Sequence, residues 1–376
     1  MASNPFTLKE VLSDAAFCDR EKEQRDLIKF AKAASNTLLY SPRRYGKTSL
    51  VKRVQNTLAV HGTITAYCDL FGVSSVDEIA GKIAKSVFAI TRKNESIFNK
   101  SVRLLTAFRP VLSPSADGGI SVSVQPAYTS GGIDLLEETL ESLQKFVGEL
   151  GKSVHIVLDE FQEITEIDKS LAIEGLLRSC IQKMNCAFVF VGSRRRILLE
   201  MFNNRKRPFF QSAVSYELKT LPRKDLIAFI NDRFKQAGKN IDSGLATEIV
   251  DRSSQHPYYT QKLCFFLFDL AQANTTGEDL SEAFQMTMDS EKALFESILS
   301  RLTAAQTILL TAIAQEPTKK LYAADYMKRH NLKSTGGIQL SLEVLAREDL
   351  IEQREKTAKW EVVDPLFQKW LRGRAL

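Results

Sequence analysis

The chain has 376 residues, of which 44% are hydrophobic and 26% charged. This composition excludes a largely disordered protein, and the length predicts two domains, or three. The formal net charge of +6 permits a polyanionic partner but does not require one, since most proteins this basic simply have a solvated surface.

Cysteine spacing and hydropathy narrow the cellular location. Five cysteines without a CxxC pair and only four histidines predict neither a zinc site nor a disulfide framework, and favour a reducing compartment. The N-terminus lacks the basic-then-apolar pattern of a signal peptide. The longest apolar run, residues 263–271, contains Asp269 and is too short to span a membrane. We therefore expect a soluble cytoplasmic protein.

Short apolar runs alternate with amphipathic stretches through the first two-thirds of the chain. Most of these runs are continuously apolar, as in parallel strands that are covered on both faces. The predicted strands are 37–40, 64–70, 154–159, 187–192 and 215–218, and the predicted helices between them are 47–60, 75–91, 134–150, 170–184 and 194–202. This order predicts an α/β fold in three αβα layers, with helices on both sides of a parallel sheet.

One segment, 94–133, interrupts this alternation and is rich in Ser, Gly and Pro. The alternating ISVSV at 120–124 could be half of a hairpin. We expect an irregular insertion with a mobile tip. A surface that contacts a partner or a neighbouring subunit is the alternative.

The pattern becomes helical after residue 221. Helices are predicted at 223–237, 242–252, 257–273 and 279–296. After about residue 297 three further helices, beginning with SRLTAAQTILLTAIAQ at 300–315, precede two short strands, LIEQRE and KWEVVD, which is the order of a winged helix. We place the domains at 1–220, 221–296 and 297–376.

The stretch SPRRYGKT at 41–48 has the spacing of the phosphate-binding P-loop signature, with Ser41 where a glycine is usual. Backbone N–H groups of such a loop and the positive end of the next helix bind phosphate oxygens. Gly46 permits unusual dihedral angles, Lys47 can reach the β- and γ-phosphates, and Thr48 can offer a hydroxyl to Mg²⁺. The nucleotide-binding residues would be Ser41, Pro42, Arg43, Arg44, Tyr45, Gly46, Lys47, Thr48 and Ser49. A chance Gly-Lys-Thr after a strand is the alternative.

A second motif, VHIVLDEFQEI at 154–164, weakens that alternative. A P-loop sheet needs a second strand that ends in a carboxylate for Mg²⁺, and Asp159 stands there. Glu160 could orient or deprotonate the attacking water. Two solvated acids at a strand end are the competing explanation, but both motifs in this order favour a site.

Ser193 ends the next predicted strand, in FVFVGSRRR. Its hydroxyl could sense the γ-phosphate or fix the water. It could equally cap the helix that follows. The sequence leaves both explanations open.

These motifs together resemble the archaeal-type ATPases, a group of P-loop proteins that also occurs in bacteria and is usually placed with the AAA+ and STAND ATPases. The resemblance rests on FCDREKEQRDLIKF, LLYSPRRYGKTSL, VLDEFQEI, FVFVGSRRRIL, KRPFFQSAVSYELKTL, HPYYTQKL and the terminal DPLFQKWLR. It covers nearly the whole chain, and the Arg-Arg-Tyr inside the loop is more specific than the generic signature.

The resemblance implies an ATP-binding αβα core, a helical lid and a C-terminal winged helix. It implies that Lys47 and Thr48 bind phosphates and Mg²⁺, that Asp159 binds Mg²⁺, that Glu160 is the catalytic base and that Ser193 senses the γ-phosphate. Asp19 and Arg20 would begin a helix that helps to enclose the adenine. His256 and Pro257 resemble a lid motif that contacts the nucleotide, although Pro257 is also explained as the first residue of a helix.

The sequence departs from the family at Gln211-Ser212, where members usually carry Gly-Arg. This departure argues against an arginine finger at that position. Arg205 and Arg207 could substitute. The basic clusters Arg194-Arg195-Arg196 and Arg205-Lys206-Arg207 could also face phosphates of DNA or of a nucleotide on a neighbouring subunit, or form a solvated surface.

The third helix of the winged helix, 334–349, is only weakly basic. Lys333, Ser334, Thr335 and Gln339 are offset by Glu343, Glu348 and Asp349, and the wing adds Arg354, Lys356 and Lys359. Packing against protein is favoured slightly over sequence-specific DNA binding.

We therefore expect an ATP-binding and ATP-hydrolysing switch whose nucleotide state controls the winged helix and could control homo-oligomerisation. The alternative is an ATP-dependent DNA-binding factor of the initiator or transposition type, with slow or structural use of ATP. A third possibility is a defence or signalling module whose effector lies on another chain. No membrane partner is expected.

Overall fold

The structure is a computed structural model that describes residues 4–8, 17–92, 94–115, 119–127, 131–354 and 357–374. It divides into two compact units, each described by itself. The α/β unit consists of Arg20–Arg43 and Lys47–Leu218. The helical unit consists of Met1–Asp19, Arg44–Gly46 and Lys219–Leu376.

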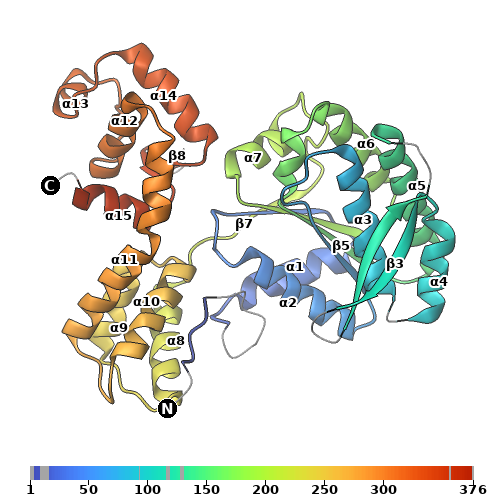
Figure 1. Ribbon diagram of the computed structural model, residues 1–376, viewed down its shortest axis with the longest axis horizontal. Coiled ribbons are helices and arrows are strands. Elements are labelled where there is room, and N and C mark those ends of the chain that lie inside the picture. The colour runs from blue at the N-terminus through green and yellow to red at the C-terminus, as the bar shows by residue number, and fades with distance from the viewer. Residues whose placement is uncertain are drawn as a thin grey trace. The chain divides into compact units, whose positions relative to one another are not determined.

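The α/β unit is built on a five-stranded sheet in the order β2-β5-β6-β1-β7, with every neighbouring pair parallel (Figure 1). The strands are β1 (Thr37–Tyr40), β2 (Ile64–Asp69), β5 (Val154–Asp159), β6 (Ala187–Gly192) and β7 (Val214–Glu217). The helices of this unit are α1 (Glu21–Lys32), α2 (Lys47–Val60), α3 (Val76–Thr91), α4 (Glu95–Leu104), α5 (Ile133–Leu150), α6 (Ser170–Gln182) and α7 (Arg195–Asn203), with a 3₁₀ turn η2 (Phe161–Glu166). The strands and helices predicted here agree with these bounds within two residues. The helix α1 was implied only by the family resemblance.

Successive strand residues face opposite sides of the sheet, which explains why the strands are continuously apolar. Leu38, Ile156 and Phe188 belong to one buried cluster with residues of α3, α5 and α6. Leu39 and Val157 alternate with them and are fully buried on the other face, where α1 and α2 contact β5 and β6. The predicted three-layer αβα fold is confirmed.

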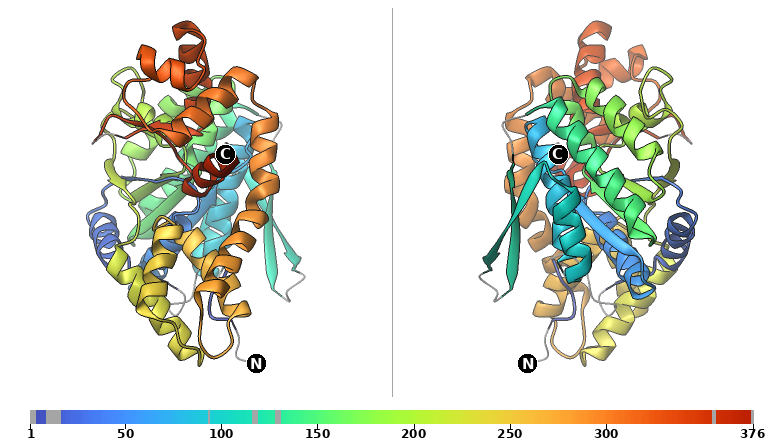
Figure 2. Two further views of the ribbon diagram at one scale, coloured as in Figure 1. Left: turned by 90° about the vertical axis from the view of Figure 1, so that its left-hand side faces the viewer. Right: turned by 90° about the vertical axis from the view of Figure 1, so that its right-hand side faces the viewer.

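The segment 94–133 is more regular than expected, so the prediction of an irregular insertion is wrong. It contains α4 and an antiparallel hairpin of β3 (Phe108–Pro114) and β4 (Ile120–Pro126), which extends away from the helices of its unit in Figure 2. Phe108 at the base of the hairpin and Val122 nearer its tip are both buried. Gly81 of α3 lies beside the Phe108 ring, where a Cβ would be at the ordinary contact distance of 3.7 Å. The predicted tip falls partly on 116–118, which lie outside the described residues.

The helical unit begins with four helices, as predicted: α8 (Arg223–Gln236), α9 (Ser243–Arg252), α10 (Pro257–Leu270) and α11 (Gly277–Ser300). Their shared core includes Ile230, Phe234 and Leu267. Phe6 from the start of the chain is buried in the same core, with its ring centroid 5.3 Å from that of Phe234.

The winged helix follows in the predicted order, with α12 (Ala304–Gln315), α13 (Ala324–Arg329), α14 (Thr335–Arg347), β8 (Ile351–Gln353) and β9 (Trp360–Val362). The predicted helix 300–315 is confirmed as α12 but starts four residues later than predicted, because α11 ends at Ser300 and a capping box on Thr303 starts α12. A further helix, α15 (Pro365–Arg374), completes this part. The wing residue Lys356 lies outside the described residues.

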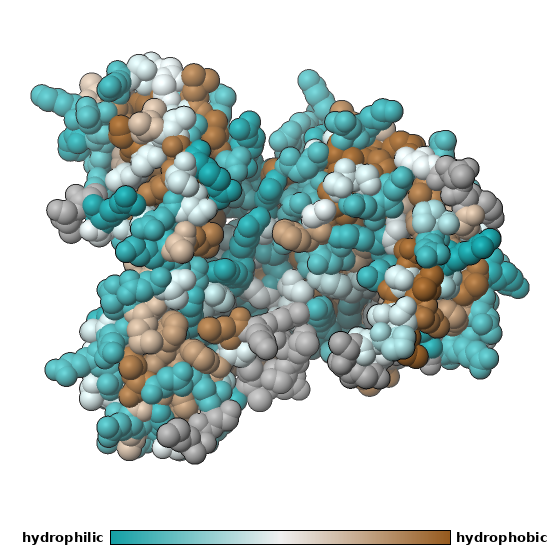
Figure 3. Space-filling model, viewed as in Figure 1, coloured by the Kyte–Doolittle hydropathy of each residue, from teal (hydrophilic) through white to brown (hydrophobic). Residues whose placement is uncertain are grey.

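The surface view mixes polar and apolar residues (Figure 3). Leu112 and Ile120 of the β3–β4 hairpin are 49% and 55% exposed. Within the described ranges, no helix combines the length and apolarity needed to cross a membrane.

Candidate nucleotide-binding site

The strand register places the predicted site residues along one edge of the sheet. Tyr40 at the end of β1 is level with Gly192 at the end of β6, and Asp69 at the end of β2 is level with Asp159 at the end of β5. The loops that follow β1, β5 and β6 therefore leave the sheet at the same carboxyl edge, where α/β sheets bind ligands.

The loop between β1 and α2 has the conformation that its glycine requires. Gly46 has a φ of +85° and Arg44 a φ of +64°. No heavy atom lies within 4 Å of the position of a Cβ on Gly46. Glycine is therefore required here for its backbone dihedral and not for space inside the protein. Ser41 is fully buried, and its hydroxyl donates to the carbonyl of Pro42 at 3.2 Å.

Lys47 is the first residue of α2, and its side chain is buried against the loop. Its Nζ donates to the carbonyl oxygens of Ser41 and Pro42, at 2.9 Å each. The ammonium charge is thus fixed beside the backbone of the predicted phosphate loop. Ser49 in the first turn of α2 is also buried.

Asp159 lies at the centre of a hydrogen-bond network. The hydroxyl of Thr48 donates to its Oδ2 at 2.9 Å, and the backbone N–H of Glu160 donates to its Oδ1 at 2.9 Å. The hydroxyl of Tyr67 in β2 donates to Oδ2 as well. Burial raises the pKa of Tyr67, and the negative charge of Asp159 raises it further, so the phenol keeps its proton and remains a donor.

This donor set suits Mg²⁺. A hydroxyl and a carboxylate oxygen are hard ligands, and Mg²⁺ typically takes one or two protein ligands while phosphates and water supply the rest. Across the described part of the chain, no group of three or more His, Cys, Asp and Glu residues could hold a metal by itself. Thr48 and Asp159 therefore fit a metal that is shared with a phosphate ligand.

Glu160 stands beside Asp159 in a left-handed backbone conformation, with a φ of 51°. The hydroxyl of Ser193 donates to its Oε2 at 3.1 Å, and the side-chain amide of Gln162 donates to the same oxygen. The helix that follows Ser193 starts after Arg194 and has no side-chain cap. The helix-capping explanation for Ser193 is therefore wrong, and its hydroxyl belongs to the Glu160 network.

Three of the six residues in the two basic clusters are already paired with carboxylates. Arg194 pairs with Glu166 at 2.6 Å, and Arg195 lies 3.9 Å from a carboxylate oxygen of Glu217. The guanidinium of Arg207 pairs with the fully buried Glu174, whose pKa is raised by burial while Arg207 opposes the rise. An arginine-finger role for Arg207 would require this pair to break. Arg196, Arg205 and Lys206 are exposed.

Three of the predicted nucleotide-binding residues, Arg44 to Gly46, group with the helical unit. Arg44 donates to Glu291 of α11 at 3.2 Å, and its guanidinium lies 4.3 Å from the ring centre of Tyr258. The rings of Tyr45 and His256 are in contact, with centroids 4.8 Å apart. Pro257 is the first residue of α10, as its alternative explanation predicts.

The remaining predicted residues stand at the start of α1. Asp19 and Arg20 both have a positive φ, of 52° and 73°. Arg20 is buried and pairs with Glu23 at 2.7 Å, while Arg43 in the phosphate loop is exposed. The structure thus gives Arg20 a local ion pair that the sequence did not indicate.

Sequence reasoning missed Tyr67, Gln162 and Glu291. Tyr67 is a polar interruption of an apolar strand, and Gln162 follows the acidic pair by two residues, so both carried a weak signal. Glu291 carried none, since it is one of several acids on a long helix. Its carboxylate is buried and also accepts from Lys262 at 2.6 Å.

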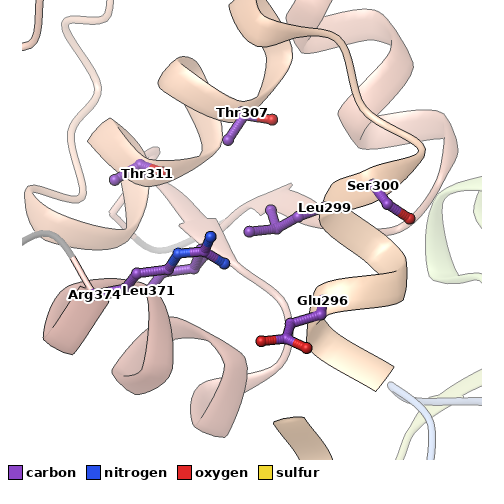
Figure 4. A pocket seen from close by; sticks show the side chains of 7 residues that line it. All are labelled: Glu296, Leu299, Ser300, Thr307, Thr311, Leu371 and Arg374. Carbon is purple, nitrogen blue, oxygen red and sulfur yellow. The ribbon is translucent and has the colours of Figure 1, made fainter. Parts of the chain in front are cut away.

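A separate hollow of about 590 Å³ lies within the helical unit. Figure 4 shows its lining, which comes from α11, α12 and α15: Glu296, Leu299, Ser300, Thr307, Thr311, Leu371 and Arg374. It shares no residue with the predicted nucleotide site.

Comparison with known proteins agrees with this description. Residues 17–263 match the family model of an ATPase domain predominantly from Archaea, and residues 293–373 match a probable winged helix domain. No curated protein sequence matches the chain.

Solved structures share the fold at low sequence identity. The Walker-type ATPase PABY2304 of Pyrococcus abyssi superposes with a TM-score of 0.73 at 17% identity, over 98% of this chain and 99% of that one. The ORC2 protein of Aeropyrum pernix, in ADPNP-ADP complexes, gives 0.57 at 14% identity, over 98% and 99%. The ORC1 protein of Aeropyrum pernix, in complex with DNA, gives 0.52 at 14% identity, over 98% and 96%. These likenesses show the P-loop NTPase-like fold with its winged helix.

The matched ATPase domain spans well over half of the chain and contains the phosphate loop, the acidic pair and Ser193. The protein therefore belongs to the family of ATPase domains found predominantly in Archaea.

Proposed function

We propose that the protein binds and hydrolyses ATP at the carboxyl edge of its sheet. The observation that carries this proposal is the convergence of Thr48 on Asp159 at 2.9 Å and of Ser193 on Glu160 at 3.1 Å, beside the buried Lys47. Three separate segments of the chain supply these groups, so a chance Gly-Lys-Thr does not account for them. The adenine nucleotides in the ORC2 complexes support the choice of ATP.

Each of these residues has a different role in the proposed phosphoryl transfer. Backbone N–H groups of the loop and the ammonium of Lys47 bind the phosphates. Thr48 and Asp159 would hold Mg²⁺, which neutralises charge on the β- and γ-phosphates when bound. The carboxylate of Glu160 takes a proton from a water whose oxygen attacks the γ-phosphorus, while the bond to the β–γ bridging oxygen breaks and ADP leaves. Ser193 fixes the carboxylate through Oε2.

ATP turnover by three variants tests this assignment. Lys47→Ala should bind ATP much more weakly, because the phosphates lose their cation. Glu160→Gln should bind ATP normally and turn it over about a hundredfold or more slowly, since the base is lost. Glu163→Gln is the matched control, because it removes a carboxylate three residues away and keeps the backbone N–H that Glu163 donates to the Glu160 carbonyl. Equal turnover by the wild type, Lys47→Ala and Glu160→Gln would refute the site.

We propose further that the nucleotide state acts on the helical unit, with a core at 1–220, a lid at 221–296 and a winged helix at 297–376. Support comes from the contacts of Arg44 with Glu291 and of Tyr45 with His256, which join phosphate-loop residues to the predicted lid helices. Homo-oligomerisation in the ATP state belongs to this proposal. Measuring mass in solution with ADP and with a non-hydrolysable ATP analogue tests it.

A second candidate function is ATP-dependent DNA binding through the winged helix. Lys319, Lys320, Lys328 and Lys333 are exposed around α13 and the start of α14, and the related fold of ORC1 occurs in complex with DNA. Against this, α14 exposes Leu340, at 68%, and Glu343. An apolar and an acidic side chain suit a protein partner better than the phosphate-lined groove of DNA. A salt titration of duplex binding discriminates, because several phosphate contacts give a steep loss of affinity with salt.

A further inference from the structure

Gln162 is a buried amide in the first turn after the acidic pair. Its neighbours in this turn, Phe161 and Ile164, are fully buried, and Gln162 itself is 0% exposed. Phe161 lies in a cluster of aromatic rings that includes Phe190 and Phe209. The amide is therefore held in place by an apolar base and has no access to solvent.

The two polar ends of the Gln162 side chain differ in their surroundings. Its Nε2 donates to Oε2 of Glu160, the oxygen that also accepts from Ser193. Its Oε1 is buried and has no hydrogen-bond partner among the described residues. A buried acceptor without a partner is destabilising. An apolar side chain would avoid this cost, so stability alone does not explain a glutamine here.

Gly192 at the end of β6 lies directly against this amide. A Cβ on Gly192 would lie 2.0 Å from Gln162 Oε1 and 2.8 Å from Leu198 Cδ1. Gly192 does not have a positive φ, so its backbone does not require glycine. Space for Gln162 and for the Leu198 methyl group is the requirement that remains, and Gln162 Oε1 is the nearer of the two.

We infer that Gln162 is a positioning residue for Glu160 and that Gly192, which has no Cβ, leaves the space that the Gln162 side chain occupies. Two donors on Oε2 fix the rotation of the carboxylate and direct Oε1 toward the water to be deprotonated. The inference rests on the proposed hydrolysis of ATP, and it adds Gln162 and Gly192 to the residues on which the rate depends.

Replacing the amide tests the inference. Gln162→Met keeps the length of the side chain and removes the donor, so turnover should fall about ten- to hundredfold. The affinity for a fluorescent ATP analogue should stay within about twofold, because no phosphate contact is lost. Gln182→Met, at an exposed position on α6, is the control and should behave as the wild type.

A double-mutant cycle separates positioning from general damage. Gly192→Ala should also slow turnover without weakening ATP binding, because the new methyl displaces the Gln162 amide. In a Gln162→Ala background, Gly192→Ala should slow turnover no further, since Gln162 Oε1 is gone and the Leu198 methyl group, at 2.8 Å, can turn into the space that the amide leaves. If Gly192→Ala alone is poorly folded, the double variant should recover the thermal midpoint of Gln162→Ala.

The outcomes distinguish the two proposals. If the wild type hydrolyses ATP and Glu160→Gln does not, but Gln162→Met and Gly192→Ala match the wild type, the positioning inference is overturned and the proposed function stands. If Gln162→Met instead weakens ATP binding and turnover equally, Gln162 supports the fold of the site and positioning is again overturned. If the wild type does not hydrolyse ATP, both proposals fail together.

Discussion

Ser41 raises the question of a phosphate loop without its first glycine. Its position does not need one, because Ser41 does not have a positive φ and its Cβ is accommodated in a fully buried site. Gly46, in contrast, has a φ of +85°, which a side chain would strain. Single residues of the loop are thus explained by backbone geometry, which motif spacing alone does not reveal.

His155 is a second residue whose environment has a measurable consequence. It is 1% exposed in β5, and Gln55, fixed by its bond to the carbonyl of Ala66, donates toward His155 Nδ1 at 3.5 Å. Burial lowers the pKa of His155 from 6.5 to about 4. The ring is therefore neutral in the folded protein at neutral pH.

We predict that this histidine makes the protein acid-sensitive. Between pH 6.5 and about 4, His155 is protonated in the unfolded chain but stays neutral in the folded protein. The free energy of unfolding is therefore unaffected by His155 above pH 6.5. It falls by about 3 kcal/mol as the pH falls toward 4. Chemical denaturation of the wild type and His155→Gln at several pH values measures it.

The variant should lose this pH dependence, whatever its stability at neutral pH. His61→Gln is the control, because His61 is exposed and its replacement should leave the pH dependence as in the wild type. Parallel curves for the wild type and His155→Gln would contradict the assignment.

Elements of the α/β unit were predictable because their signals are local. A continuous apolar run predicts a buried parallel strand, and strand ends predict which loops meet. The order β2-β5-β6-β1-β7 was not predictable, since register depends on pairings between residues more than 100 positions apart, such as Leu38 with Phe190. The proximity of Ser193 to Glu160 therefore needed the structure.

In the β3–β4 hairpin, the local sequence signal points away from the structure that forms. Pro110, Pro114 and Pro126 stand within its strands and argue against a sheet when read alone. They are tolerated because a two-stranded sheet has only edge strands. The hairpin packs on α3, where Gly81 lies beside Phe108 and Val124. No local pattern in the sequence indicates this contact.

The start of α12 gives a prediction for a single element. Thr303 accepts from the N–H of Gln306 at 3.3 Å, and the Gln306 side chain accepts from the N–H of Thr303 at 2.9 Å. Thr303→Ala should destabilise the helical unit by about 1 kcal/mol, because the first N–H groups of the helix lose their acceptor. Thr303→Ser keeps the acceptor and should retain most of the stability. Equal denaturation midpoints for Thr303→Ala and the wild type would show that the cap contributes nothing.

The helical unit shows why domain boundaries read from the sequence remain predictions. The predicted lid and winged helix have separate hydrophobic cores but form one compact unit. Phe295 of α11 packs on Phe367 of α15, with centroids 4.9 Å apart, and Tyr259 of α10 belongs to the core of the winged helix. The first of these contacts joins residues 72 positions apart, and Tyr259 also contacts Asp364, which lies 105 positions away.

The hydroxyl of Tyr259 donates to Asp364 Oδ2 at 2.5 Å, and Asp364 Oδ1 accepts the first N–H groups of α15. Burial raises the pKa of Asp364, while the hydrogen bond from Tyr259 lowers it. The bond therefore stabilises the charged carboxylate in a site where charge is unfavourable. Tyr259 lies three residues from His256, whose ring contacts Tyr45, so the same helix joins a phosphate-loop residue to the winged helix.

We predict that Tyr259→Phe weakens this junction most at neutral pH. Without the donor, the pKa of Asp364 rises further, and a carboxyl with a raised pKa in the folded state loses stability as the pH rises above 3.8, its ordinary value. The difference in unfolding free energy between Tyr259→Phe and the wild type should be about 1–3 kcal/mol at pH 7 and should shrink toward pH 4. Tyr322→Phe, at a 49% exposed position, is the control for loss of a phenol. A cost that is equal at pH 7 and pH 4 would mean that Tyr259 contributes packing alone and that Asp364 is held as well without it.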